Sequence, residues 1–133
     1  MRSRRLASFI IPVTLVTTVA AGAIPAQAAA KPAVTRNSTC SMGSLSNLQV
    51  QREDNGTLSI DFGVDMVTHA SGVNWTYRVV DNRSVVMRGT ASTIADGSFS
   101  VTRAITPMTG SNYILAIAKN AATGETCRIR IIG

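Results

Sequence analysis

Apolar and polar residues alternate with a period of two over most of the chain, and this alternation limits the fold more than any other feature. Leu58, Ile60 and Phe62 are separated by polar residues, and the same pattern recurs around Trp75 and near the C-terminus. Successive side chains of a strand point to opposite faces, so the pattern predicts strands with one buried face. Signals for helices are nearly absent after residue 28. We therefore expect an all-β domain.

Seven segments carry strand patterns, with turn residues between them. The segments are 45–52, 58–66, 73–79, 85–90, 99–105, 113–118 and 127–131. Asp54-Asn55-Gly56 supplies residues that tolerate positive φ, which predicts a tight hairpin between the first two strands. Seven short strands separated in this way favour an antiparallel sandwich of two sheets.

The alternation also predicts which side chains face the core. All five aromatic residues after residue 28 lie on the expected core phase: Phe62, Trp75, Tyr77, Phe99 and Tyr113. No Trp or Tyr is then left for an exposed platform that stacks on sugars. In segment 113–118 the same phase places three larger residues inside, namely Tyr113, Leu115 and Ile117. Three others are then expected to face outward, namely Ile114, Ala116 and Ala118.

Two features resemble a known fold family. Trp75 lies on the third predicted strand, where immunoglobulin-like and fibronectin type III-like domains place their core Trp. The stretch from Ile105 through Pro107 to Tyr113 is similar to the approach to their sixth strand, where a Tyr hydroxyl bonds back to the preceding loop. The resemblance implies a seven-stranded sandwich in which the sixth strand lies between the third and the seventh. Because sandwiches host unrelated activities, it implies little about function.

Residues 1–28 have the pattern of a cleaved export signal. Three arginines give a positive start, residues 9–23 are apolar and uncharged, and Ala26-Gln27-Ala28 is a small-residue cleavage site. The apolar stretch is short for a membrane span, which needs about 20 residues, so a retained anchor is the less favoured alternative. We expect a secreted, extracellular protein with no stable membrane span, a flexible lead-in over 29–39 and a sandwich domain over 40–133. The whole sequence also resembles small secreted proteins of high-GC Gram-positive bacteria, which implies the same organisation.

Cys40 and Cys127 are the only cysteines. An even pair in an exported chain predicts a disulfide, which here joins the start of the domain to its end. The chain-entropy model assigns such a loop about 4 to 5 kcal/mol of stabilisation. A catalytic thiol is the alternative, but it needs a histidine base, and His69 is the only histidine. Antibody domains place their cysteines on the second and sixth strands, so this chain departs from that pattern.

Candidate catalytic and metal-ligating residues are few. His69 alone cannot make a zinc site, and oxidised cysteines leave no thiolate to help it. Asp61 and Asp65 lie on one face of a strand at a separation of about 13 Å. Glycosidase carboxyl groups lie roughly 5 to 9.5 Å apart, so this pair is too wide for that chemistry. We expect no catalytic residue, no metal and no cofactor.

Charge provides the one functional lead. The whole chain has a net charge of +6, and losing three arginines with the signal leaves ten Lys/Arg against seven Asp/Glu, a net of +3. Four arginines are expected to face outward on one sheet, around the apolar sixth strand: Arg78, Arg88, Arg128 and Arg130. Guanidinium groups pair well with carboxylates and phosphates. The set is either a binding face for an anionic partner or a solvated, edge-protecting charge pattern.

These observations favour a secreted, non-catalytic binding domain that contacts an anionic cell-envelope polymer or a protein. The alternative is a secreted protease inhibitor or effector that acts through a loop, with residues 68–72 and 107–112 as the candidate loops. A hydrolase is the least favoured class. Nucleic acid is not an expected partner, because the chain has no basic run and no spare aromatic residues for stacking. We expect a monomer, with an edge-strand dimer as the alternative.

Overall fold

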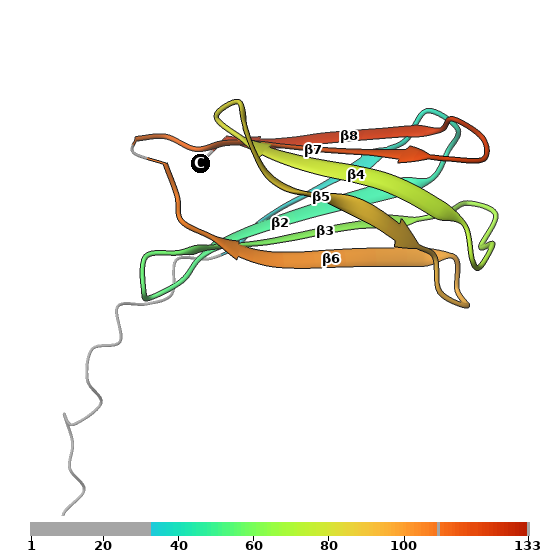
Figure 1. The fold of residues 1–133 in the computed structure, drawn as a ribbon, viewed down its shortest axis with the longest axis horizontal. Coiled ribbons are helices and arrows are strands. Elements are labelled where there is room, and N and C mark those ends of the chain that lie inside the picture. Colours follow the sequence, from blue (N-terminus) through green and yellow to red (C-terminus); the bar gives the residue numbers. More distant parts are fainter. Residues whose placement is uncertain (1–32, 109, 133) are drawn as a thin grey trace, which may run out of the picture.

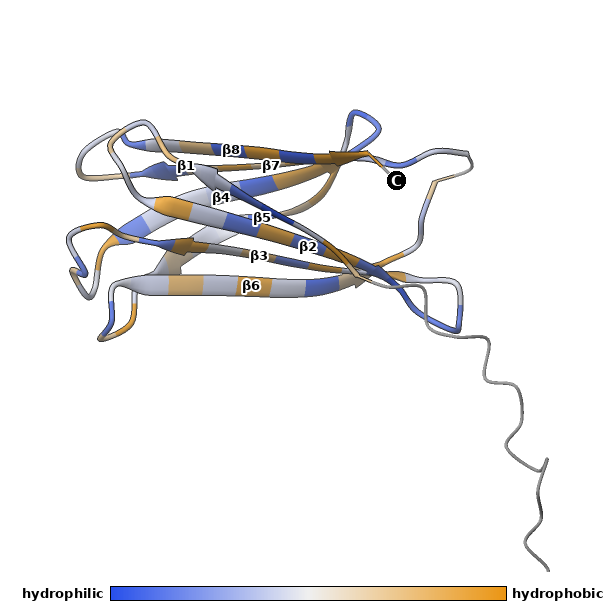
Figure 2. Ribbon diagram, turned by 180° about the vertical axis from the view of Figure 1, so that it is seen from behind, coloured by the Kyte–Doolittle hydropathy of each residue, from blue (hydrophilic) through white to orange (hydrophobic). Residues whose placement is uncertain are grey.

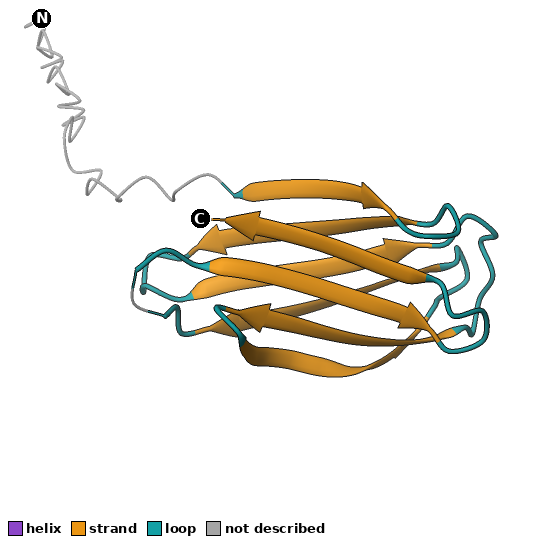
Figure 3. Cartoon of the chain, turned by 90° about the horizontal axis from the view of Figure 1, so that it is seen from above, coloured by secondary structure: helices purple, strands orange, loops and turns teal. Residues whose placement is uncertain are grey.

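The computed structural model describes residues 33–108 and 110–132, and in this part the chain forms eight antiparallel strands and no helix (Figure 3). The predicted signal and the first residues of the predicted lead-in lie outside the described residues. The strands are β1 (Val34–Thr39), β2 (Leu45–Arg52), β3 (Leu58–Asp65), β4 (Asn74–Asp81), β5 (Ser84–Ser92), β6 (Ser98–Ile105), β7 (Tyr113–Asn120) and β8 (Thr126–Ile132).

The strands form two four-stranded sheets that pack face to face, which confirms the predicted all-β sandwich (Figure 1). The first sheet has the order β1-β2-β3-β6, and the second has the order β5-β4-β7-β8. In the predicted set of seven, β4, β7 and β8 are the third, sixth and seventh strands. β7 lies between the other two, as the immunoglobulin-like arrangement implied.

β1 is a strand that the sequence analysis did not predict. It occupies part of segment 29–39, which was expected to be a flexible lead-in, and it pairs with β2 from Val34↔Val50 to Thr39↔Leu45. Almost every β1 side chain is exposed at the sheet edge. Backbone pairing rather than burial therefore holds this strand, and an edge strand of this kind leaves no apolar alternation in the sequence.

The core lies between the two sheets and follows the predicted alternation in most strands (Figure 2). Its centre is Phe99 of β6, whose ring centroid lies 6.4 Å from Phe62, 6.0 Å from Trp75 and 6.4 Å from Tyr77. The first of these neighbours belongs to the same sheet as Phe99, and the other two belong to the opposite sheet. Aromatic pairs contribute about 0.5 to 1.5 kcal/mol each beyond the area that they bury, so this cluster joins the layers.

The predicted facing of β7 is wrong. Ile114, Ala116 and Ala118 are buried, whereas the alternate residues from Tyr113 to Ile117 are half-buried on the outer face. Both phases of this strand are apolar, so alternation alone could not choose between them. The register with β4 decides the matter, because it sets the two alanines beside large core side chains, Tyr77↔Ala118 and Val79↔Ala116.

Among the described residues, Asn82 makes the tie before β7, and no hydrogen bond of the Tyr113 hydroxyl, which the family resemblance implied, is found there. The Asn82 N–H donates to the Tyr113 carbonyl (3.0 Å), and its Nδ2 donates to the Ser111 carbonyl (2.9 Å). Asn82 Oδ1 in turn accepts the Tyr113 N–H (2.8 Å). Asn82 has a φ of 46°, a left-handed conformation that Asn tolerates better than most residues.

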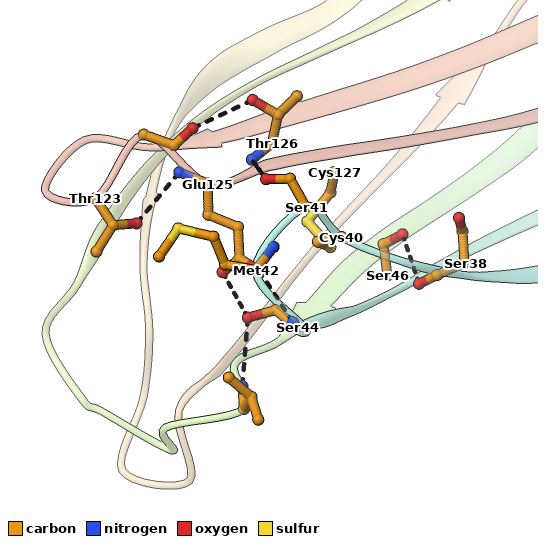
Figure 4. The surroundings of a disulfide bond; sticks show 12 residues. Ser38, Cys40, Ser41, Met42, Ser44, Ser46, Thr123, Glu125, Thr126 and Cys127 are labelled. Carbon is orange, nitrogen blue, oxygen red and sulfur yellow. Dashed lines mark hydrogen bonds between the residues drawn. A yellow bond between two sulfur atoms is a disulfide. The ribbon is translucent and has the colours of Figure 1, made fainter.

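The predicted disulfide between Cys40 and Cys127 is present, with a Cα–Cα distance of 4.3 Å (Figure 4). Cys40 follows β1 and Cys127 lies on β8, so the bond joins the edges of the two sheets. Both cysteines are buried in the core. A buried disulfide is consistent with an extracellular location.

A buried carboxylate holds the turn beside the disulfide (Figure 4). Glu125, in the connection before β8, is only 3% exposed. One of its oxygens accepts the backbone N–H groups of Met42 (2.9 Å) and Ser44 (3.0 Å), and the other accepts the Ser44 hydroxyl (2.7 Å). These bonds fasten the β1–β2 turn of one sheet to the β7–β8 turn of the other.

Replacing Glu125 with alanine should lower the free energy of unfolding by about 2 to 4 kcal/mol, because three donors lose a charged acceptor. Urea unfolding followed by Trp75 fluorescence measures the change. Glu125→Gln should retain part of the stability, because its amide oxygen can still accept. Glu53→Ala in the β2–β3 turn is the control, with an expected change within about 0.5 kcal/mol. A Glu125→Ala loss no larger than that of the control would contradict the role of this carboxylate.

Gly97 provides a second test of how the loops at this end pack. It has a φ of 80°, and a β-carbon there would lie 2.3 Å from the Cα of His69 in the β3–β4 loop. Gly56 has a similar φ of 83°, but a β-carbon there would meet nothing within 4 Å. Gly56→Ala should therefore lose only the backbone preference, about 1 to 2 kcal/mol. Gly97→Ala should lose about 1 to 3 kcal/mol more, because it adds a steric overlap. Equal melting temperatures for the two variants would show that the loops move apart freely.

Candidate functional site

The outer face of the second sheet carries basic side chains from all four of its strands. They are Arg88 on β5, Arg78 on β4, Lys119 on β7, and Arg128 and Arg130 on β8, all exposed. Half of the ten Lys and Arg residues that follow residue 28 therefore lie on this one face. The outward positions of these strands hold no Asp or Glu.

The opposite face of the sandwich has the reverse charge. Asp61 and Asp65 face outward on β3, and the outward positions of β2, β3 and β6 carry no Lys or Arg. Within the described residues, the one basic and acidic pair of side chains closer than 4 Å is His69 Nδ1 with Asp65 Oδ1, at 3.9 Å. The two faces thus differ in sign, and in the described part of the chain the basic side chains of the second sheet have no internal counter-charge.

Strand register aligns three of the arginines in one row across the sheet. Arg88 lies opposite Arg78, Arg78 lies opposite Ile117, and Ile117 lies opposite Arg128. Neighbouring strands are about 4.8 Å apart, so the row spans about 14 Å at the backbone. We name this set the arginine row. Arg130 lies two residues further along β8, opposite Leu115.

A shallow groove of about 600 Å³ crosses part of the arginine row. Arg78, Arg88 and Lys119 line it with positive charge, Thr76 and Thr90 add hydroxyl groups, and Ile117 adds an apolar surface. Gly89 of β5 also lines the groove. A β-carbon at this position would lie only 2.8 Å from the Tyr77 hydroxyl oxygen, which is too close without a shift of one of the two. The groove therefore combines cations and hydroxyl donors, the groups that bind phosphate or carboxylate oxygens.

Arg78 and Arg88 are directly opposed on neighbouring strands. Like charges in this position destabilise a sheet, and no carboxylate among the described residues lies within 4 Å of either guanidinium group. A charge pattern that served only solubility would not need to place two arginines face to face. A bound anion would remove the repulsion, so the pair is the most informative feature of this face.

The structure places all four predicted arginines on the expected face, although not in one groove. Arg78 and Arg88 share the groove, whereas Arg128 and Arg130 line a separate hollow of about 280 Å³. The apolar strip between them is formed by Leu115 and Ile117 rather than by the inward-facing residues of β7. Sequence analysis did not single out Lys119, because it assigned the outer face of β7 to the wrong phase.

Sequence analysis did not single out Arg103 of β6 either. Its side chain lies beside β5, where it lines a hollow of about 480 Å³ together with Arg88. The strand pattern of β6 gave no sign of this, because the contact depends on how the edges of the two sheets meet. Arg88, on the edge strand of the sheet, therefore lines two basic hollows.

Other candidate chemistry is sparse in the described residues. His69 is exposed in the β3–β4 loop, where its Nδ1 lies 3.3 Å from the Asp96 carbonyl oxygen. Hydrogen bonds from Ser98 lower the pKa of Asp96 below its ordinary value. No three His, Cys, Asp or Glu side chains gather as metal ligands in the described part of the chain. The same part contains no helix able to cross a membrane.

Comparison of the chain with protein-family models, with curated proteins and with solved structures gives no match. Function is therefore inferred from the geometry of this chain.

Replacing Arg88 with glutamate tests the repulsion within the arginine row. The substitution turns a like-charge pair into an attractive one, so the melting temperature of the ligand-free protein should rise by about 2 to 5 °C at low salt. The gain should shrink in 1 M NaCl, where the Debye length is about 3 Å. Arg36→Glu on β1, opposite Leu48, is the control and should give no such gain. A variant no more stable than the wild type at low salt would argue against the repulsion.

Proposed function

We propose that this protein is a secreted, non-catalytic binding domain that holds an anionic polymer of the cell envelope against the outer face of its second sheet. The arginine row on a face without carboxylates is the observation that carries the proposal. The export pattern of residues 1–28 and the buried disulfide support a location outside the cell.

A polymer suits this face better than a small anion. The groove is shallow, so it cannot enclose a small ligand and strip it of water. An exposed ion pair contributes only about 0 to 1 kcal/mol, so one phosphate or carboxylate on one arginine binds weakly. A chain of linked anions reaches several basic side chains at once, and the linkage makes each further contact intramolecular.

The residues between the cations fit the same ligand. Leu115 and Ile117 are half-buried on the outer face and offer apolar contact to the carbon skeleton of a polymer. Thr76 and Thr90 offer hydroxyl groups beside the guanidinium groups of the groove. Arginine forks bind planar carboxylates and phosphates through two parallel hydrogen bonds, which gives orientation as well as charge.

Co-sedimentation with isolated bacterial cell envelope tests the proposal. The wild-type protein should be retained at low salt and released as salt rises. The triple variant Arg78→Gln, Arg88→Gln, Arg128→Gln should bind at least about tenfold more weakly, because losing about 1.4 kcal/mol is a tenfold change.

The matched control is the triple variant Arg36→Gln, Arg52→Gln, Arg83→Gln. It removes the same three charges from other parts of the sandwich, so both variants have equal net charge. We expect it to bind within about threefold of the wild type. Equal loss in both variants would mean that total charge, rather than the arginine row, determines retention. A wild-type protein that stays in the supernatant at low salt would refute an envelope polymer as the ligand.

A further inference from the structure

At one end of the sandwich, beside the connection from β6 to β7, two polar side chains are buried and have no hydrogen-bond partner among the described residues. Asp81 ends β4 with 0% of its surface exposed, and neither of its carboxylate oxygens has a partner. Asn112 directly precedes β7 with 3% exposed, and its Oδ1 also has no partner. Native proteins satisfy almost all such groups, so three buried acceptors at one place need an explanation.

Strand register brings the two side chains to the same place. Asp81 pairs with Ile114, and Asn112 lies two residues before Ile114 on the same, core-facing side. Such diagonal neighbours have Cα atoms about 7 to 8 Å apart, close enough for two side chains to share a ligand. The hydrogen bonds of Asn82 to the residues on either side of Asn112 hold this backbone in place.

The surroundings do not compensate the charge of Asp81. Burial raises the pKa of its carboxyl group, and the backbone N–H of Met108 lowers it by less. That N–H approaches the carboxylate without reaching hydrogen-bond geometry. In the described residues, no Lys, Arg or His lies within 4 Å of Asp81. Buried charges in proteins are paired or bind metal ions, so this carboxylate lacks a counter-ion.

We propose that Asp81 and Asn112 bind a hard, oxygen-preferring cation, with Ca²⁺ as the best match. All three free atoms are oxygens, and neither an imidazole nor a thiolate accompanies them, which disfavours zinc and copper. Ca²⁺ accepts carboxylate and amide oxygens in irregular geometry and completes its shell with backbone carbonyls and water. Mg²⁺ requires a near-ideal octahedron and gives up its water reluctantly.

The cation would act as a structural tie rather than as part of the arginine row. Asp81 faces the core at the end of β4, whereas Arg78 of the same strand faces outward. Calcium sites of extracellular modules have dissociation constants of about 10⁻⁴ to 10⁻³ M, and a site with only two protein side chains belongs at the weak end. The ion would join the end of β4 to the residues that lead into β7.

Two metal-free arrangements compete with this proposal. The Asn112 amide could be turned so that its nitrogen donates to Asp81, since the oxygen and nitrogen of an amide have nearly the same shape. A protonated Asp81 could instead donate to the Asn112 oxygen. Both alternatives satisfy the pair without an ion, and both predict a stability that does not depend on calcium.

Calorimetric melting of the purified protein tests the site, after treatment with a chelator and then with CaCl₂ at constant ionic strength. For a dissociation constant near 1 mM, about 10 mM CaCl₂ should raise the melting temperature by roughly 5 to 10 °C. NaCl at the same ionic strength should not reproduce the rise. Isothermal titration with CaCl₂ should give one site for each chain.

Asp81→Asn should abolish the calcium-dependent rise, and its metal-free form should melt no lower than the metal-free wild type, because a buried charge has been removed. Asn112→Ala should weaken calcium binding at least about tenfold. Asp61→Asn on the outer face of β3 is the control and should keep the full rise. A wild-type protein whose melting temperature does not respond to calcium overturns the proposal, and so does a rise that Asp81→Asn retains.

Discussion

The pairing of β7 with β4 is the constraint on which both faces of the second sheet depend. On the inner face it sets Ala116 and Ala118 beside Val79 and Tyr77, so that small residues make room for large ones. On the outer face the same register places Ile117 beside Arg78. A slip of one residue would turn every side chain of β7 to the other face, burying a lysine and disrupting the arginine row. Core packing therefore determines the geometry of the candidate binding face.

The two ends of the sandwich are held in different ways. At the end that contains the disulfide, Glu125 accepts hydrogen bonds from three donors, and Gly97 lets two loops approach each other closely. At the other end, the buried side-chain oxygens of Asp81 and Asn112 have no partner among the described residues. The unpartnered atoms differ between the ends: nitrogen donors of Trp75 and Asn120 at the first, and oxygen acceptors, which a donor or a cation could satisfy, at the second. The proposed ion at the second end would join the end of β4 to the residues that lead into β7.

Charge is divided between the two outer faces, and the proposed binding function rests on this division. The first sheet presents Asp61 and Asp65, and the second presents five cations around a half-buried apolar strip. The groove at Arg78 and Arg88 is shallow. The proposed extended ligand would contact such a surface at several weak points at once. The rigid sheet beneath keeps those contacts at fixed spacing.

Much of the fold could be predicted from sequence, because burial on one face leaves a period of two in the chain. The strand over 45–52 was predicted with its observed bounds, and the cysteine pair was predicted from its number and context. β1 could not be predicted, because an exposed edge strand is specified by backbone hydrogen bonds that are the same for every residue type. The facing of β7 could not be predicted either, because both of its phases are apolar.

The candidate sites, too, could be predicted from the sequence only in part. Alternation along the chain is enough to predict that four arginines point outward, since it assigns each of them to a face: Arg78, Arg88, Arg128 and Arg130. That three of them form a row could be seen only in the folded protein, because strand order and register are set by packing between residues far apart in the chain. Likewise, only the fold decided that Asp81 and Asn112 are buried together, because the burial of a polar residue depends on what the rest of the chain places over it.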